Sequence, residues 1–101
     1  MERDQVIAAL KSHEHELRTA GVLSVSLFGS VARGGDSAHD VDVAVRLSQN
    51  FSARGLNYFN RLSELEERLS GILGCKVDVI EEPVRKKRFQ TEIDRDRALA
   101  F

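Results

Sequence analysis

Hydrophobic and polar residues alternate along this chain with two different periods. Three segments alternate with a period of two, which is typical of β-strands: 22–28, 40–47 and 75–80. Three others carry apolar residues at helical spacing: 4–20, 57–73 and 84–95. The pattern therefore predicts an α/β or α+β fold, with a small mixed sheet of about three strands and helices packed on it.

The ends of these elements carry recognisable signals. Asp4 is suited to cap the first helix, and Gly21 and Gly74 are suited to end the first and second. The other segments are expected to be irregular: a Gly- and Ser-rich connection with a helical turn (29–39), a polar loop (49–57) and a short tail (97–101).

The apolar residues also predict which side chains face the core. In the first strand we expect Leu23, Val25 and Leu27 to share one face. In the second helix the core stripe is expected to consist of Tyr58, Phe59, Leu62 and Leu65. Phe51 and Phe89 fit neither pattern, and if exposed either would suit a protein interface.

Length and charge restrict the class of protein. The chain has 101 residues, which predicts a single domain over residues 1–101. It contains no apolar run of membrane-spanning length, and its one cysteine excludes an internal disulfide, so we expect a cytoplasmic protein. Its 15 Lys and Arg against 16 Asp and Glu give a net charge of -1, which argues against direct binding of nucleic acid.

The chemistry concentrates between the first two strands. Gly29 lets backbone approach a phosphate closely, and Ser30 adds a hydroxyl and an N–H group at the start of a turn. Arg33 offers a planar fork of donors to phosphate oxygens. Asp40 and Asp42 lie two apart on a strand, so both carboxylates emerge on one face, and Mg²⁺ prefers such oxygen ligands. The stretch predicts a phosphate cradle beside a metal platform.

The third strand adds a further carboxylate. Asp78 stands between Val77 and Val79, which we expect to face the core, so its side chain points to the opposite face. If this strand neighbours the second, Asp78 lies beside Asp40 and Asp42. Three clustered carboxylates repel one another unless cations neutralise them. Such a cluster suits a two-metal site for phosphoryl or nucleotidyl transfer.

Simpler interpretations exist for each motif taken alone. An isolated Asp-x-Asp is most often a solvated strand face, and only its combination with the Gly-Ser turn and Asp78 favours a nucleotide site. His39 is best interpreted as an exposed loop residue beside Asp40. The basic run Arg85–Arg88 is flanked by acidic residues, which favours a solvated helix face.

The segment LFGSVARG followed by DVDVAV resembles the signature of the polymerase-β-type nucleotidyltransferases. The small size is similar to the minimal nucleotidyltransferase branch, whose members include MntA-like antitoxins paired with HEPN-domain toxins. The interval between Ser30 and Asp40 is nine residues, one fewer than in most minimal members, and His39 stands where serine is common.

This resemblance implies a nucleotidyltransferase fold and a role for each motif residue. Gly29 and Ser30 would contact the triphosphate, with Arg33 as a further phosphate contact. Asp40, Asp42 and Asp78 would hold two Mg²⁺ ions, and Asp78 would also act as general base.

The implied reaction is transfer of AMP from ATP to a hydroxyl of another macromolecule, with release of pyrophosphate. The acceptor implied by the MntA-like proteins is a tyrosine of a HEPN-type toxin, so that the chain acts as an antitoxin. Its assembly would be a homodimer or a hetero-oligomer. Two alternatives stay open: a catalytically weak module that silences its partner by binding alone, and one subunit of a transferase acting on a small molecule.

Overall fold

The computed structural model describes residues 2–34, 40–52 and 57–101. Its helices are α1 (Arg3–Ser12), α2 (Glu14–Thr19), α3 (Gly29–Ala32), α4 (Gln49–Ser52), α5 (Tyr58–Leu73) and α6 (Lys87–Asp96). Its strands are β1 (Val22–Phe28), β2 (Asp40–Leu47), β3 (Lys76–Glu81) and β4 (Ala98–Leu99). The alternation of helices and strands agrees with the α+β fold that the sequence predicts.

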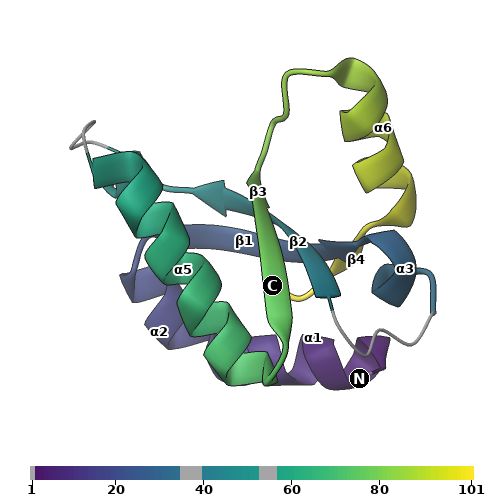
Figure 1. Ribbon diagram of the computed structural model, residues 1–101, viewed down its shortest axis with the longest axis horizontal. Helices are drawn as coiled ribbons and strands as arrows, with labels where there is room; N and C mark the ends of the chain where they lie inside the picture. The colour runs from purple at the N-terminus through teal and green to yellow at the C-terminus, as the bar shows by residue number, and fades with distance from the viewer. Residues whose placement is uncertain (1, 35–39, 53–56) are drawn as a thin grey trace.

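The strands form one mixed sheet in the order β3-β2-β1-β4 (Figure 1). β1 is antiparallel to β2 and to β4, whereas β2 and β3 are parallel. The described sheet thus has four strands, one more than predicted. The sequence predicts only an irregular tail at the position of β4, because a two-residue strand is too short to show alternation. The end of the tail is nevertheless held, since Ala100 N–H donates to the carbonyl of Val25 at 2.9 Å.

Helices cover both faces of the sheet. α1, α2 and α5 pack on one face over the larger hydrophobic core, which includes Val41, Val43 and Val45 of β2. α6 lies on the other face, where Phe28, Ala44 and Ile93 form a smaller cluster (Figure 1). α3 follows the end of β1, and its Val31 and Ala32 join the larger core. Because α6 covers only part of its face of the sheet, the polar positions of β2 and β3 reach the surface there.

The first helix differs from its prediction. Instead of one helix over 4–20, α1 and α2 are separated at His13, because the Ser12 hydroxyl donates to the carbonyl of Ala9 at 2.7 Å and competes with the helical ladder. Asp4 is not the cap. Glu2 occupies that position, and its N–H donates to the side chain of Gln5 at 3.1 Å.

Three apolar residues also lie elsewhere than predicted. Leu23 is 51% exposed, because the register between β1 and β2 shifts by one residue between Val22 and Ser24 and turns it outward. Phe59 is 78% exposed although the helical pattern placed it in the core. Phe51 is buried in α4, where a polar loop was predicted. In the described part of the chain, no helix is long and apolar enough to span a membrane.

Candidate active site

The parallel pairing of β2 with β3 brings two carboxylates side by side. Asp42 is the register partner of Asp78, while Val41 and Val77 form the preceding pair and point into the core. Because side chains alternate along both strands, Asp42 and Asp78 emerge on the same face of the sheet. The prediction that Asp78 lies beside the Asp-x-Asp pair is therefore confirmed for Asp42. Asp40 begins β2, is exposed, and lies opposite Lys76.

Gly29 closes the site from the neighbouring strand. Phe28, the last residue of β1, is the register partner of Asp42, so the chain turns into α3 directly beside that carboxylate. Gly29 has a φ of +77°, and a Cβ added there would lie 2.6 Å from Asp42 Oδ2. Only glycine fits both requirements without strain. Ser30 follows it, exposed, at the beginning of α3.

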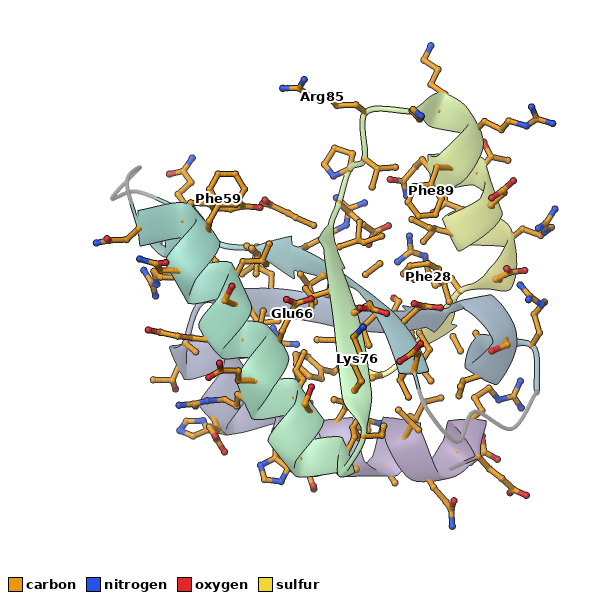
Figure 2. All side chains as sticks on the ribbon, viewed as in Figure 1. Phe28, Phe59, Glu66, Lys76, Arg85 and Phe89 are labelled. Carbon is orange, nitrogen blue, oxygen red and sulfur yellow. The ribbon has the colours of Figure 1, made fainter. Side chains whose placement is uncertain are left out.

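The electrostatics of the site centre on Asp42. Partial burial raises the pKa of the Asp42 carboxyl above its ordinary value, and the negative charges of Asp78 and Asp40 raise it further. The positive charge of Arg33 opposes this rise in pKa. Lys76, which Figure 2 labels on β3, has its Nζ 4.0 Å from Asp78 Oδ1. The site therefore concentrates negative charge that a bound cation would relieve.

The donor chemistry of these residues suits Mg²⁺. Among the described residues, no three His, Cys, Asp or Glu side chains are gathered closely enough to hold a metal ion by themselves. Asp42 and Asp78 nevertheless supply the paired carboxylate oxygens that Mg²⁺ usually combines with substrate phosphates and water. The assignment of two ions to Asp40, Asp42 and Asp78 stays a prediction.

Arg33 lies at the end of α3 with a partner that sequence reasoning missed. Its Nη1 donates to Asp96 Oδ2 at 2.6 Å. The side chain of Asp96 is only 10% exposed, whereas that of Arg33 is 56% exposed and reaches solvent. The two residues stand 63 positions apart, so no local pattern indicates their contact. His39, which the sequence predicts to be an exposed loop residue beside Asp40, lies outside the described residues.

A groove runs along the outer side of the carboxylate pair, between α5 and β3. It is lined by Ser63, Glu66, Glu67, Ser70, Lys76, Val77 and Asp78. Two of these side chains also cap the open edge of β3: Ser70 Oγ accepts the N–H of Val77 at 3.1 Å, and Glu66 Oε2 accepts that of Val79 at 3.0 Å. Asp78 thus borders a groove whose other lining residues come from α5 and β3.

Comparison with known proteins agrees with this geometry. The profile of the nucleotidyltransferase domain family matches residues 7–99. This chain belongs to that family. A protein of Methanocaldococcus jannaschii named "Putative protein adenylyltransferase" is 40% identical over 75 residues, which cover 70% of this chain and 69% of the relative.

Two solved structures share the fold of this nucleotidyltransferase domain. One, described as a "putative minimal nucleotidyltransferase", has a TM-score of 0.76 at 24% identity and covers 97% of this chain and 95% of its own. The other, a mutant of the toxin-antitoxin MntA-HpeT, has a TM-score of 0.64 at 17% identity and covers 100% of this chain and 73% of its own. The expected nucleotidyltransferase fold is thus confirmed.

Proposed function

We propose that this chain is a Mg²⁺-dependent protein adenylyltransferase that moves AMP from ATP to a hydroxyl group of a partner protein. The observation that carries the proposal is the pairing of Asp42 with Asp78 beside Gly29. Clustered carboxylates with a raised pKa at Asp42 cost stability in a bare protein. They become favourable when they hold a cation together with a phosphate chain.

Each predicted site residue receives a role in this proposal. Gly29 and Ser30 would contact the triphosphate through backbone and hydroxyl at the turn into α3. Asp40, Asp42 and Asp78 would hold two Mg²⁺ ions. Arg33, which is exposed near Asp42, would contact a phosphate. Bound Mg²⁺ supplies charge stabilisation for the transferred phosphoryl group and for the leaving pyrophosphate.

The reaction is an exchange of one oxygen for another on the α-phosphorus of ATP. The acceptor hydroxyl oxygen forms a bond to that phosphorus, and the bond to the bridging oxygen of the β-phosphate breaks. Pyrophosphate leaves with the electron pair of the broken bond. The proton of the hydroxyl passes to the carboxylate of Asp78, which borders the open groove through which an acceptor would approach.

We further propose that the acceptor is a tyrosine of a HEPN-type toxin and that the modification makes this chain an antitoxin. The name of the Methanocaldococcus relative supports an adenylyl group and a protein acceptor. The likeness of fold to a toxin-antitoxin component supports a toxin as the partner. We place the whole function in one domain over residues 1–101.

Mass spectrometry of a reconstituted mixture tests this function. The purified chain is incubated with the product of a neighbouring toxin gene, Mg²⁺ and each of ATP, GTP, CTP and UTP in turn. We expect an AMP-sized increase in the mass of the toxin with ATP, none with Asp42→Asn, and an unchanged increase with Asp4→Asn, a control of equal charge change at an exposed residue. Silencing of the toxin without an adduct, and equally by Asp42→Asn, would show a binding module instead.

A further inference from the structure

The ion pair between Arg33 and Asp96 joins the proposed nucleotide site to the last turn of α6. Arg33 Nη1 lies 2.6 Å from Asp96 Oδ2, a short charge-assisted contact. The contact is unequal, because the Asp96 side chain is 10% exposed and that of Arg33 is 56% exposed. The buried carboxylate is therefore the fixed partner, and the longer arginine is held by it.

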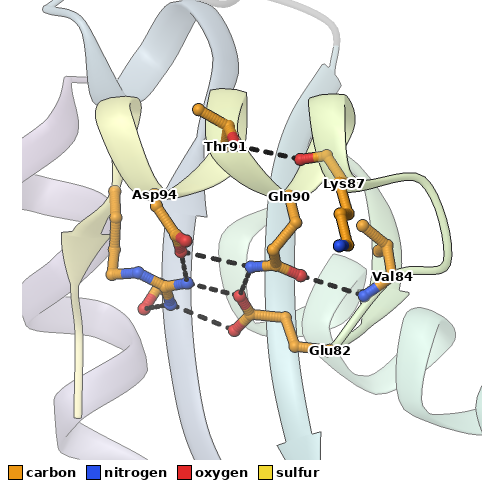
Figure 3. A network of polar contacts seen from close by, with 8 residues as sticks. Glu82, Val84, Lys87, Gln90, Thr91 and Asp94 are labelled. Carbon is orange, nitrogen blue, oxygen red and sulfur yellow. Dashed lines mark hydrogen bonds and ion pairs between the residues drawn. The ribbon is translucent and has the colours of Figure 1, made fainter.

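The residues beside Asp96 at the end of α6 belong to a network of polar contacts (Figure 3). Arg97, the next residue, donates to both carboxylate oxygens of Glu82, whose side chain is fully buried. Arg97 also donates to Asp94 at 2.6 Å and to Ser26 of β1 at 2.9 Å. Gln90 adds a bond to Glu82 at 2.8 Å. These bonds fasten the last turn of α6 to the sheet.

A second carboxylate, that of Asp42, competes with Asp96 for Arg33. The backbone N–H of Arg33 donates to the carbonyl of Gly29 at 3.2 Å, and a Cβ on Gly29 would lie 2.6 Å from Asp42 Oδ2, so Arg33 stands one helical turn from the residue packed against that carboxylate. An arginine released from Asp96 would turn toward Asp42, because a guanidinium pairs readily with a carboxylate. It would then neutralise a carboxylate that Mg²⁺ requires. In the structure Nη1 faces Asp96 instead, and the guanidinium has further N–H donors on its exposed side.

We propose that Asp96 is a positioning residue, which holds Arg33 ready for a phosphate of the nucleotide and keeps it away from Asp42. This inference rests on the proposed function, since it requires a phosphate at Arg33 and Mg²⁺ at Asp42. It assigns to α6 a role in nucleotide and metal binding, whereas the sequence pattern places no α6 side chain in the nucleotide site.

Titration calorimetry of Mg²⁺-ATP binding tests the proposal, with Asp96→Asn as the main variant. We expect about 10-fold weaker binding and an approximately 3- to 10-fold higher Mg²⁺ concentration for half-maximal binding, the scale of one charge-assisted hydrogen bond. Glu92→Gln, an equal charge change at an exposed position of the same helix, should bind as the unsubstituted chain does. Asp96→Glu keeps the charge and should retain most of the affinity.

The double variant Arg33→Gln with Asp96→Asn separates positioning from a general structural role. Removing the arginine removes the competitor for Asp42, so the Mg²⁺ requirement should return to that of the unsubstituted chain, while ATP binding stays weak. A merely structural Asp96 would leave the Mg²⁺ requirement raised in the double variant, and that result would overturn the proposal. Binding by Asp96→Asn equal to that of Glu92→Gln would overturn it as well.

Two further measurements distinguish a failure of this inference from a failure of the proposed function. Nuclear magnetic resonance of the Arg33 Nη–H groups in the unsubstituted chain should show restricted rotation of the Nη1 group that donates to Asp96, and a freely rotating group would refute the inference even if Asp96→Asn fails to fold. If the unsubstituted chain binds none of the four nucleoside triphosphates with Mg²⁺, the proposed function itself fails. If it binds ATP and Asp96→Asn binds equally well, only the role of Asp96 fails.

Discussion

Replacing Gly29 with alanine tests whether the close approach between α3 and Asp42 serves the site. Alanine at a φ of +77° costs about 1–2 kcal/mol, because left-handed backbone is disfavoured for residues with a Cβ. In addition, the new Cβ would lie 2.6 Å from Asp42 Oδ2, so the carboxylate must move. A displacement on the order of 1 Å at a reacting group costs about 100-fold in rate.

Gly74→Ala provides the matched control. Gly74 has a similar φ of +71°, but a Cβ there would meet nothing within 4 Å. Both variants should therefore have the same backbone strain, seen as a decrease of about 5–15 °C in the melting temperature, and Gly29→Ala adds the contact with Asp42. Gly74→Ala should keep AMP transfer and Mg²⁺-ATP binding close to those of the unsubstituted chain.

The assay measures initial rates of transfer by mass spectrometry and melting temperatures by circular dichroism for the same preparations. The difference in rate between the two alanine variants, once both are folded, isolates the displacement of Asp42. Equal rates for Gly29→Ala and Gly74→Ala would refute the reasoning, because the shared backbone strain would then account for the whole effect.

Three other substitutions have expected outcomes. Asp42→Asn should abolish transfer but leave the melting temperature at pH 7 equal or higher, because it removes a carboxylate whose ionised form is disfavoured in the fold. A lower melting temperature would contradict this. Mg²⁺ should raise the melting temperature of the unsubstituted chain only. Glu66→Ala should lower the free energy of unfolding by about 1 kcal/mol and promote self-association, seen by gel filtration, because it uncovers the N–H of Val79 at the edge of β3. Glu67→Ala, at an exposed position of the same helix, should do neither. Glu82→Gln should lower the free energy of unfolding at pH 7 by about 3 kcal/mol, because it breaks a buried ion pair. Unfolding curves at several pH values check this, and a pH dependence of stability equal to that of the unsubstituted chain would argue against it.

The expected pH profile of Glu82 follows from the direction of its shift. Hydrogen bonds from Arg97 lower the pKa of Glu82 in the folded chain below its ordinary value of 4.5. The stabilisation is therefore complete above pH 4.5 and is lost as the pH falls below that value through the folded pKa. The Glu82→Gln variant should show a flatter loss of stability in this acidic range.

Much of the site could be predicted from local sequence. A period of two over 40–47 places Asp40 and Asp42 on one face of a strand, because successive side chains point to opposite faces. The Gly-Ser pair after an apolar strand predicts a turn, and the structure places α3 there. Gly74 ends α5 in the left-handed conformation that glycine favours. These features depend on neighbours a few residues apart.

Other predictions failed because the deciding contacts are distant in sequence. The one-residue register shift between β1 and β2 turns Leu23 outward, and the alternating pattern of β1 does not predict this shift. β4 exists because the chain end pairs with β1 in a two-residue register. Phe59 has helical spacing yet is exposed, since the packing of α5 and not the spacing decides which stripe is covered.

The sequence by itself determined which chemical groups this chain carries and on which face of each strand they stand, because backbone geometry fixes those properties locally. Only the tertiary structure decided which of these groups meet. The parallel register sets Asp42 beside Asp78, the turn into α3 brings Gly29 against Asp42, and the docking of α6 gives Arg33 its partner Asp96. The physical reason is that electrostatic and steric effects depend on distances in space, which strand register and helix packing set.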